Sequence, residues 1–413
     1  MKSRTLEDGR LSGGSTPSGG ALRNDVTREA GAPRARARQV GYPSPARIVS
    51  VRLSPSYPTY SAGVTRQFRI VDLFSGCGGM TTGFAETGLF TPVAAVELDQ
   101  SAAATYALNH GEHVYVGDIN AWVRGSTPRA DVIVGGPPCQ GFSALGKKDP
   151  KDPRNGLWDA YAEAVRKIRP AFFVLENVPQ FVKSQQYAAL QRETTSRGRL
   201  TGWELEAHVV NAANYGTAQN RRRAVVIGRR SGVRPIGLPP STAAALTVQE
   251  VLTAVPASPL PTSLPASRVT VNGAVAAGPF RTTDLHFSRR PSTADMARYR
   301  AIPPGGDRRD LPPELMHRCW REHGSGRGDV MGRLHWGKPA VTIRTEFFRP
   351  EKGRFLHPVE HRPITHLEAA LIQGFPRDFL WAGTPASIAR QIGNAVPPPL
   401  ARALAEHLAK RLV

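Results

Sequence analysis

The sequence predicts an α/β fold with a mostly parallel sheet, and three observations support this class. Short apolar stretches alternate with helical stretches from about residue 68 to residue 228. A glycine-rich turn at residues 75–79 follows the first apolar stretch. Acidic residues come directly after several of the later apolar stretches, which would place them at the carboxyl edge of a parallel sheet. This alternation is typical of repeated βαβ units.

The length of 413 residues allows two domains and a tail at about 150 residues per domain. Residues 1–66 are rich in Gly, Ser, Pro and Arg, which predicts a disordered basic tail. Residues 67–228 carry the α/β pattern. In residues 229–337 Pro, Ser, Thr, Ala and Gly dominate, which predicts a smaller, irregular second domain. Residues 338–413 return to the first domain and end in a helix.

The net charge of +21, from 54 Lys and Arg against 33 Asp and Glu, favours a polyanionic partner, nucleic acid before membrane. An arginine-rich composition without a specific partner is the alternative. Three cysteines, Cys77, Cys139 and Cys319, are too few for a disulfide framework and fit a reducing cytosol. No apolar stretch approaches membrane-spanning length, so we expect a soluble, intracellular protein with no membrane contact.

The first apolar stretch, residues 68–74, and the turn after it resemble a nucleotide-binding unit. Glu97 follows the second predicted strand, about 20 residues after the turn, where a carboxylate holds ribose hydroxyls. Asp118 follows the third strand at the same edge. Thr81 stands where the dinucleotide fingerprint has Gly or Ala. The pattern therefore leaves both a nicotinamide cofactor and another adenosine-bearing cofactor open.

Cys139 lies after the fourth predicted strand, Val132 to Gly135, on a Gly-Gly-Pro-Pro turn. Two glycines and two prolines end a strand abruptly, so the thiol would sit on a stiff turn at the ligand-binding edge. A thiol in that position could act as a nucleophile if its surroundings favour the thiolate. A small buried core cysteine is the equally weighted alternative.

Glu176 follows the fifth predicted strand, next to the strand of Cys139, and is interpreted as an acid of the site. Arg221 and Arg223 precede another strand, where alternation would send both to one side, although a solvated charge run is the usual origin of such a pattern. The basic loop of residues 144–155 is long for an α/β connection, which is typical of a functional loop or lid.

The last third of the chain contains a helix with clear end signals and several histidines. Thr365 and Glu368 form a capping box that begins a helix, and Gly374 ends it. The histidine groups fit no zinc spacing that we recognise, so no metal site is expected. These groups comprise His317, His323 with Cys319, and His357, His361, His366.

With these pieces in order, the chain resembles the DNA (cytosine-5)-methyltransferase family over roughly residues 68–228 and 336–413. Each matching stretch is modest alone, but together in the family's order they are very specific. The stretches are Asp72–Gly79, Gly136–Ser143, Glu176–Val178, Gln219–Arg223, Lys338–Arg344, Gln373–Pro376 and Gln391–Pro397.

The resemblance implies a Rossmann-like, S-adenosylmethionine-dependent domain at 67–228 and 338–413, with target recognition at 229–337. The implied catalytic residues, with Cys139 as nucleophile and Glu176 at cytosine N3, are Cys139, Glu176, Arg221 and Arg223. The implied S-adenosylmethionine-binding residues are Asp72, Phe74, Gly76, Gly78, Gly79, Glu97, Asp118, Ile119, Pro138, Asn394 and Val396. The implied DNA contacts are Gln140, Ser143, Lys147, Lys148 and Arg154.

The resemblance further implies a monomeric enzyme acting on double-stranded DNA in the cytoplasm, associated with the nucleoid. It implies either the modification enzyme of a restriction–modification system, with a cognate restriction endonuclease acting separately, or an orphan methylase. Family members that act on tRNA carry a Cys-Phe-Thr stretch, which this sequence lacks. Two rival interpretations stay open. A nicotinamide-dependent oxidoreductase would leave Cys139 and Glu176 without a role, and a catalytically inactive DNA-binding relative would not need them.

Overall fold

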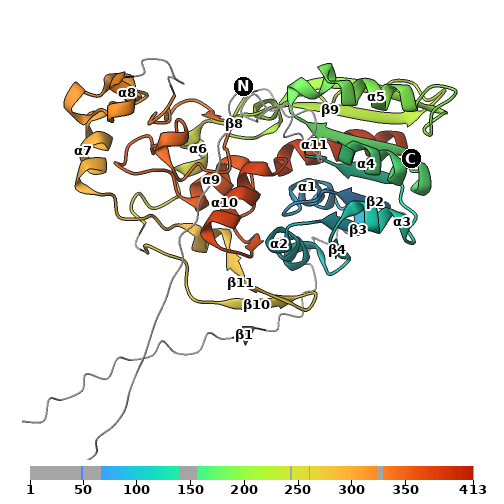
Figure 1. Ribbon diagram of the computed structural model, residues 1–413, viewed down its shortest axis with the longest axis horizontal. Coiled ribbons are helices and arrows are strands. Elements are labelled where there is room, and N and C mark those ends of the chain that lie inside the picture. The colour runs from blue at the N-terminus through green and yellow to red at the C-terminus, as the bar shows by residue number, and fades with distance from the viewer. Residues whose placement is uncertain are drawn as a thin grey trace, which may run out of the picture. The chain divides into compact units, whose positions relative to one another are not determined.

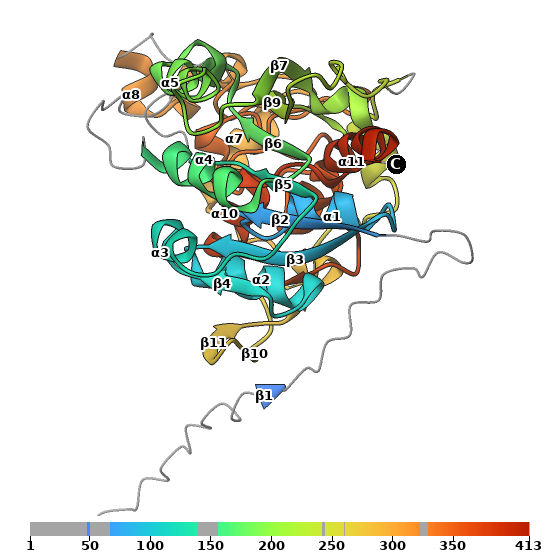
Figure 2. The ribbon, with the colours of Figure 1, turned by 90° about the vertical axis from the view of Figure 1, so that its right-hand side faces the viewer.

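A seven-stranded sheet organises the protein in the computed structural model (Figures 1 and 2). The structure describes residues 48–49, 67–138, 156–241, 244–259, 261–322 and 329–412. The sheet order is β4-β3-β2-β5-β6-β9-β7, in which β9 runs antiparallel to its neighbours β6 and β7 and the other six strands all run in one direction. The predicted mostly parallel α/β fold is confirmed. The strands are β2 (Phe68–Leu73), β3 (Phe90–Glu97), β4 (Val114–Val116), β5 (Val132–Gly135), β6 (Phe172–Asn177), β7 (Trp203–Asn211) and β9 (Arg222–Arg230).

Helices cover both faces of this sheet because its strands are apolar on both sides. On one face pack α1 (Gly79–Ala85), α2 (Gln100–His110) and α11 (Pro398–Leu412). On the other face pack α3 (Ile119–Arg124), α4 (Leu157–Ile168) and α5 (Gln185–Glu193). A Cβ on Gly83 of α1 would lie 2.3 Å from the carbonyl oxygen of Pro398, so this glycine lets α1 approach α11 closely. The C-terminal helix is thereby bound to the first βα unit.

A second core joins residues 248–287 to the C-terminal segment. It includes α6 (Val248–Leu252), α9 (His366–Gln373) and α10 (Pro385–Asn394). Here β12 (Phe280–Arg281) pairs with β14 (Leu380–Trp381), and β13 (Ala340–Val341) pairs with β8 (Gln219–Asn220). The predicted capping box of Thr365 and Glu368 is present on α9, and Gly374 ends that helix at φ 88°.

The segment expected as one irregular domain, residues 229–337, contributes to several cores. The β10 (Arg268–Val271) and β11 (Ala274–Ala277) hairpin packs against α2. Near α7 (Thr293–Ala301) and α8 (Arg318–Glu322), a small cluster contains Tyr299, Ile302, Leu311, Met331 and Leu356. Within the expected tail, β1 (Ile48–Val49) pairs with β10, and the tail's other residues lie outside the described ranges. No described helix is long and apolar enough to cross a membrane.

Candidate active site

Strand β5 ends at the centre of the sheet, between β2 and β6, and leads to the turn before Cys139. Along this segment the described residues end at Pro138 and resume at residue 156. Cys139 and the expected DNA contacts lie outside the described residues, and these are Gln140, Ser143, Lys147, Lys148 and Arg154. The structure therefore shows the strand and the turn that precede Cys139.

The Gly-Gly-Pro-Pro turn is held against its two neighbouring strands. A Cβ on Gly135 would lie 2.2 Å from the carbonyl oxygen of Leu73, too close for any side chain. The side-chain amide of Asn177, at the end of β6, donates a 3.0 Å hydrogen bond to the carbonyl of Pro137. Because Pro137 and Pro138 also restrict the backbone, the position before Cys139 is rigid.

Glu176 lies in the last two residues of β6, which the sequence predicts to end at Leu175. The strand continues because β9 pairs with it as far as Asn177. The Glu176 side chain is mostly buried, with 9% of the residue exposed. Its Oε1 lies 2.8 Å from Nε of Arg223, and no aligned hydrogen bond satisfies that oxygen. A buried carboxylate that is paired but still able to accept a hydrogen bond suits recognition of a polar ring edge.

The two predicted arginines take different positions. Arg223 reaches Glu176, as described, and its exposed neighbour Arg222 faces away. Arg221 is fully buried and donates hydrogen bonds to the backbone carbonyls of Ile343, at 3.1 Å, and Gly393, at 2.9 Å. Burial lowers the pKa of Arg221 well below its usual value. Arg221 therefore joins β8 and β9 to the C-terminal segment.

The glycine turn after β2 has three residues in the left-handed region, with φ of 60° at Phe74, 56° at Gly76 and 88° at Gly78. The Gly76 amide donates a 2.8 Å hydrogen bond to Oε2 of Glu97, and the Asp99 amide donates one of 2.7 Å to Oε1. Nothing lies within 4 Å of a Cβ built on Gly76, so the space beside the turn is open. Burial raises the pKa of Glu97.

Asp72, an expected cofactor residue, is fully buried beneath this turn. Its Oδ2 accepts a 2.6 Å hydrogen bond from the hydroxyl of Thr81. Burial raises the pKa of Asp72 to about 7. Thr81 occupies the position at which a dinucleotide fingerprint has Gly or Ala, and its hydroxyl here binds the carboxylate that ends the first strand.

At the third strand, Asp118 is exposed and caps α3 by accepting from the amide of Asn120 at 2.9 Å. Ile119 is buried in the core beside it. Leu98, between Glu97 and Asp99, is 73% exposed and was not predicted from the sequence. The sequence feature that could have singled out Leu98 is an apolar residue between two acids at the end of a strand. A flat ligand ring at this position would cover the Leu98 side chain.

The C-terminal stretch that contains the expected cofactor residues Asn394 and Val396 contacts the glycine turn at Val396. A Cβ on Gly79 would lie 2.4 Å from the carbonyl oxygen of Val396, so the two backbones touch at this point. Asn394, at the end of α10, is exposed, and Val396 is half-buried. Two segments more than 300 residues apart in sequence thus form one wall.

A buried pair of glutamines, also missed by sequence reasoning as site residues, connects these parts. The Gln219 side chain donates to Oε1 of Gln373, and its own Oε1 accepts from the amide of Ile343 at 3.1 Å. Gln373 in turn donates to the carbonyls of Ile392, at 2.5 Å, and Ala395, at 3.3 Å. Both glutamines lie in stretches that resemble the family, and this is the sequence feature that could have identified them as site residues.

Among the described residues, no group of three His, Cys, Asp or Glu could hold a metal ion. Two of the three clustered histidines have separate backbone partners. The amides of Val359 and Glu360 donate to Nδ1 of His357, and Nε2 of His366 lies 2.9 Å from the carbonyl oxygen of Pro385.

A model of the C-5 cytosine-specific DNA methylase family matches residues 68–410. The chain belongs to this family. Type II methyltransferase M1.HphI of Haemophilus parahaemolyticus is 31% identical over 82% of this chain and 86% of its own length. Type II methyltransferase M.DdeI of Desulfomicrobium norvegicum is 32% identical over 82% of this chain and 88% of its own length. As a C-5 cytosine methylase, the chain is a methyltransferase, which decides against the oxidoreductase interpretation.

The fold agrees with this family. A crystal structure titled as a DNA modification methyltransferase encoded within an E. coli prophage matches with a TM-score of 0.62. The match covers 83% of this chain and 99% of that one at 24% identity. A second, the Entamoeba histolytica methyltransferase EhMeth, has a TM-score of 0.54 at 15% identity over 84% of this chain and 100% of that one. At these identities the two matches support the fold alone.

Proposed function

We propose that this C-5 cytosine methylase transfers a methyl group from S-adenosylmethionine to C5 of a cytosine in a specific double-stranded DNA sequence. The reaction would proceed through a covalent Cys139–C6 intermediate on a flipped-out base. The observation that carries the proposal is the Glu176–Arg223 pair beside the rigid turn that precedes Cys139. Family membership supports the reaction class, and the pairing of Glu176 with Arg223 next to the turn that precedes Cys139 supports the proposed roles of Glu176 and Cys139.

In the proposed reaction the Cys139 sulfur forms a bond to C6, and the C5=C6 electron pair moves into the ring. Glu176 contacts N3 and the exocyclic amine and offsets the charge that develops there. Arg223 holds the Glu176 carboxylate in place and faces the same ring. C5 would then take the methyl group, whose bond to the sulfur of S-adenosylmethionine breaks, so that S-adenosylhomocysteine leaves. The C5 proton is lost to solvent, its electron pair re-forms the C5=C6 double bond, and the S–C6 bond breaks with its electrons returning to the Cys139 sulfur.

The residues around the glycine turn fit S-adenosylmethionine, which supplies the methyl group when bound. Open space beside Gly76 and the close approach of Val396 to Gly79 form a cradle for the methionine end. Glu97, already positioned by two amides, would accept the ribose hydroxyls, and Leu98 would cover the adenine ring. The exposed Asp118 would accept from the adenine amine.

We assign catalysis to residues 67–228 and 338–413, and target recognition to residues 229–337. Cytosine C5 is unreachable inside a duplex, so the base must leave the stack. The basic loop of residues 144–155 would close over it, with Lys147, Lys148 and Arg154 near phosphates. The relatives are Type II methyltransferases, so we propose a modification role beside a separate restriction endonuclease, with the enzyme acting as a monomer in the cytoplasm.

Transfer of tritium from methyl-labelled S-adenosylmethionine to duplex DNA tests the proposal directly. Duplexes carrying 5-fluorocytosine at the methylated site should form a denaturation-resistant adduct, because that carbon then has no proton to lose. Cys139→Ser should abolish the adduct, and Glu176→Gln should slow transfer by about 10²-fold or more. Absence of transfer to any DNA, with wild-type protein that binds the cofactor, contradicts the proposal and favours an inactive relative.

A further inference from the structure

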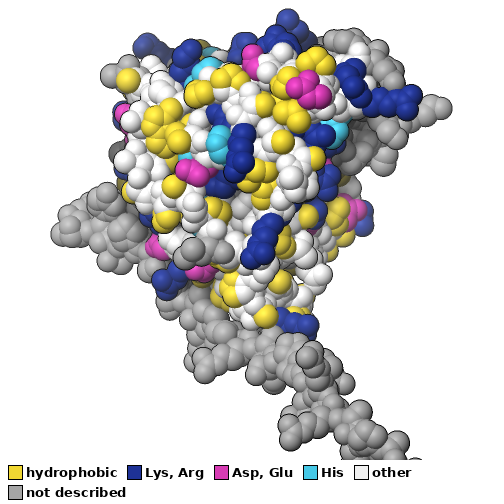
Figure 3. All heavy atoms as spheres, turned by 90° about the vertical axis from the view of Figure 1, so that its left-hand side faces the viewer, with side chains coloured by type: hydrophobic (Ala, Val, Ile, Leu, Met, Phe, Trp, Pro, Cys, Tyr) yellow, Lys and Arg dark blue, Asp and Glu magenta, His cyan; other side chains and the backbone are white. Residues whose placement is uncertain are grey.

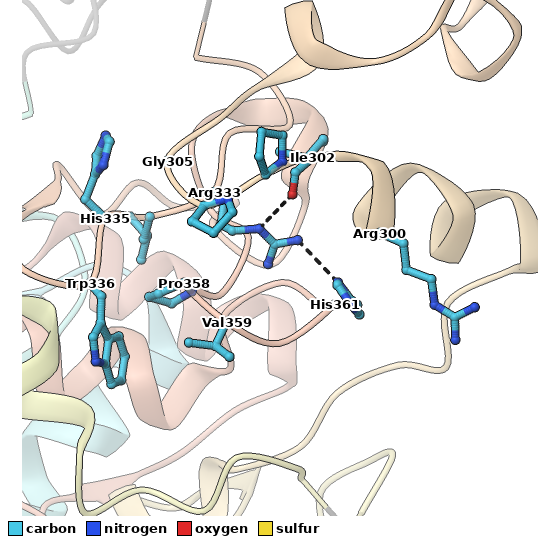
Figure 4. A pocket seen from close by; sticks show the side chains of 12 residues that line it. Arg300, Ile302, Gly305, Arg333, His335, Trp336, Pro358, Val359 and His361 are labelled. Carbon is cyan, nitrogen blue, oxygen red and sulfur yellow. Dashed lines mark hydrogen bonds between the residues drawn. The ribbon is translucent and has the colours of Figure 1, made fainter.

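A hollow of about 380 Å³ lies between residues 300–305, 333–336 and 358–361 (Figure 4), and neither Glu176 nor Glu97 lines it. Trp336, Pro358 and Val359 line one side of it, and Arg300 lies on the other. Most of its lining surface is apolar, and no carboxylate is among the lining residues that the structure describes. None of the residues proposed for catalysis or cofactor binding lines this hollow, although most of its lining belongs to the segment assigned to target recognition.

The floor of the hollow is rigid because a buried arginine joins its three segments. The Arg333 guanidinium is buried and lies 3.4 Å from Nδ1 of His361. It donates hydrogen bonds of 2.6 to 3.1 Å to the backbone carbonyls of Tyr299, Ile302, His357 and Glu360. Arg333 makes no close ion pair among the described residues, and the carboxylate that acts on its pKa is that of Glu360. The floor therefore carries positive charge in a fixed shape, and its donors are already occupied.

The mouth of the hollow adds an apolar edge and further cations. Val359 is 63% exposed, on a loop that Arg333 fixes from beneath. Arg300 is exposed and makes no ion pair within the described ranges. Residues 289–361 contain fifteen Lys and Arg against nine Asp and Glu. Dark-blue side chains are spread over the face that carries α7 and α8 (Figure 3).

The geometry points to a binding site for one unpaired nucleotide of a DNA strand, distinct from the site of the target cytosine. Its base would stack against Trp336 and Pro358, and its phosphate would face Arg300. An apolar wall with a tryptophan suits a flat ring, and a cationic mouth without carboxylates suits a phosphate. The volume lies at the lower end of that of small-ligand sites. The choice of DNA as the source of the nucleotide rests on the proposed function.

The test uses a thymidine pentanucleotide with a fluorescent label, because it contains no cytosine for the proposed catalytic site. Fluorescence anisotropy with the full-length protein should show salt-dependent binding. Trp336→Ala should weaken binding about tenfold or more, the change expected for loss of one stacked base, whereas Trp336→Phe should largely preserve it. Glu176→Gln should bind the pentanucleotide as the wild type does.

Trp336 is partly buried, so a second variant keeps the test independent of folding. Val359→Glu places a negative charge at the mouth and should abolish binding of the pentanucleotide. Val275→Glu on β11 is the matched control, because Val275 is also 63% exposed. Arg300→Ala should weaken binding and reduce its salt dependence, and Arg124→Ala on α3 should not.

Equal affinity of the wild type, Trp336→Ala and Val359→Glu for the pentanucleotide would overturn the site, as would absence of binding by the wild type. Methyl transfer to duplex DNA is measured separately on the same preparations. A protein that transfers methyl groups but binds the pentanucleotide no better than its Val359→Glu variant disproves this site alone. A protein that binds the pentanucleotide through Trp336 but transfers nothing disproves the proposed function alone.

Discussion

A Cβ on Gly136 would lie 3.1 Å from Oε2 of Glu176, so the backbone before Cys139 passes directly against the carboxylate. The missing side chain at Gly136 is what allows this approach. The strand that carries Glu176 and the turn that precedes Cys139 are therefore in contact in the free protein.

Gly136→Ala should slow methyl transfer about tenfold, because Glu176 must move by a few tenths of an ångström while Arg223 holds it. Single-turnover kinetics with saturating cofactor measure this step. Gly156→Ala is the control, since nothing lies within 4 Å of a Cβ at that position. Equal rates for the two variants would contradict the contact.

Arg223→Met should lower the rate of transfer by about 10²-fold, because the buried carboxylate of Glu176 loses its charged partner at 2.8 Å. Arg222→Met changes the neighbouring, exposed arginine of the same strand and should leave the rate within about twofold of wild type. The comparison uses kcat for transfer and thermal unfolding for stability. Similar losses of kcat in both variants would show that the rate depends on the net charge of this segment and not on the contact between Arg223 and Glu176.

Asp72 should make the free enzyme less stable as pH rises from about 4 to about 7. Its pKa is raised to about 7 by burial, so the folded state binds a proton that the unfolded state releases. Stability is therefore highest below the unfolded pKa, falls through this window and is constant above it. Asp72→Asn should remove this part of the pH dependence, and Tm measured between pH 5.5 and 8.5 should show it. A constant difference in Tm between wild type and variant across that range would disprove the assignment.

The glutamine pair should show strong coupling between its two members. Gln373→Leu leaves the amide of Gln219 buried without its partner, and Gln219→Leu does the converse. The free energy of unfolding of the double variant should exceed the value expected from adding the two single losses by about 1 kcal/mol or more. The KM for S-adenosylmethionine should rise in each variant, because Gln373 binds the carbonyls of Ile392 and Ala395 beside the cofactor wall. Additive losses of unfolding free energy with an unchanged KM would show that the two side chains contribute only packing and are not coupled.

Local patterns in the sequence were sufficient for the strands and the helix ends. Apolar stretches predicted strands at β2, β5 and β6, with β6 next to β5, and the capping box at Thr365 predicted the start of α9. These features depend on neighbouring residues, whose backbone preferences can be read from their types. The end of β6 was placed two residues too early, because only pairing with β9 extends that strand through Glu176 and Asn177.

The sequence by itself predicted that carboxylates, a glycine turn, a cysteine and two arginines would meet at the carboxyl edge of one sheet, and it determined the strands that carry Glu97 and Glu176 to that edge. Alternation also placed Arg222 facing outward. Only the tertiary structure decided that Arg223 pairs with Glu176 while Arg221 binds the carbonyls of Ile343 and Gly393. The physical reason is that both arginines have the same chemistry in sequence, and which partner each one meets is decided by segments distant in sequence that only folding brings within hydrogen-bond distance. The two carbonyl partners of Arg221 lie more than 100 residues away.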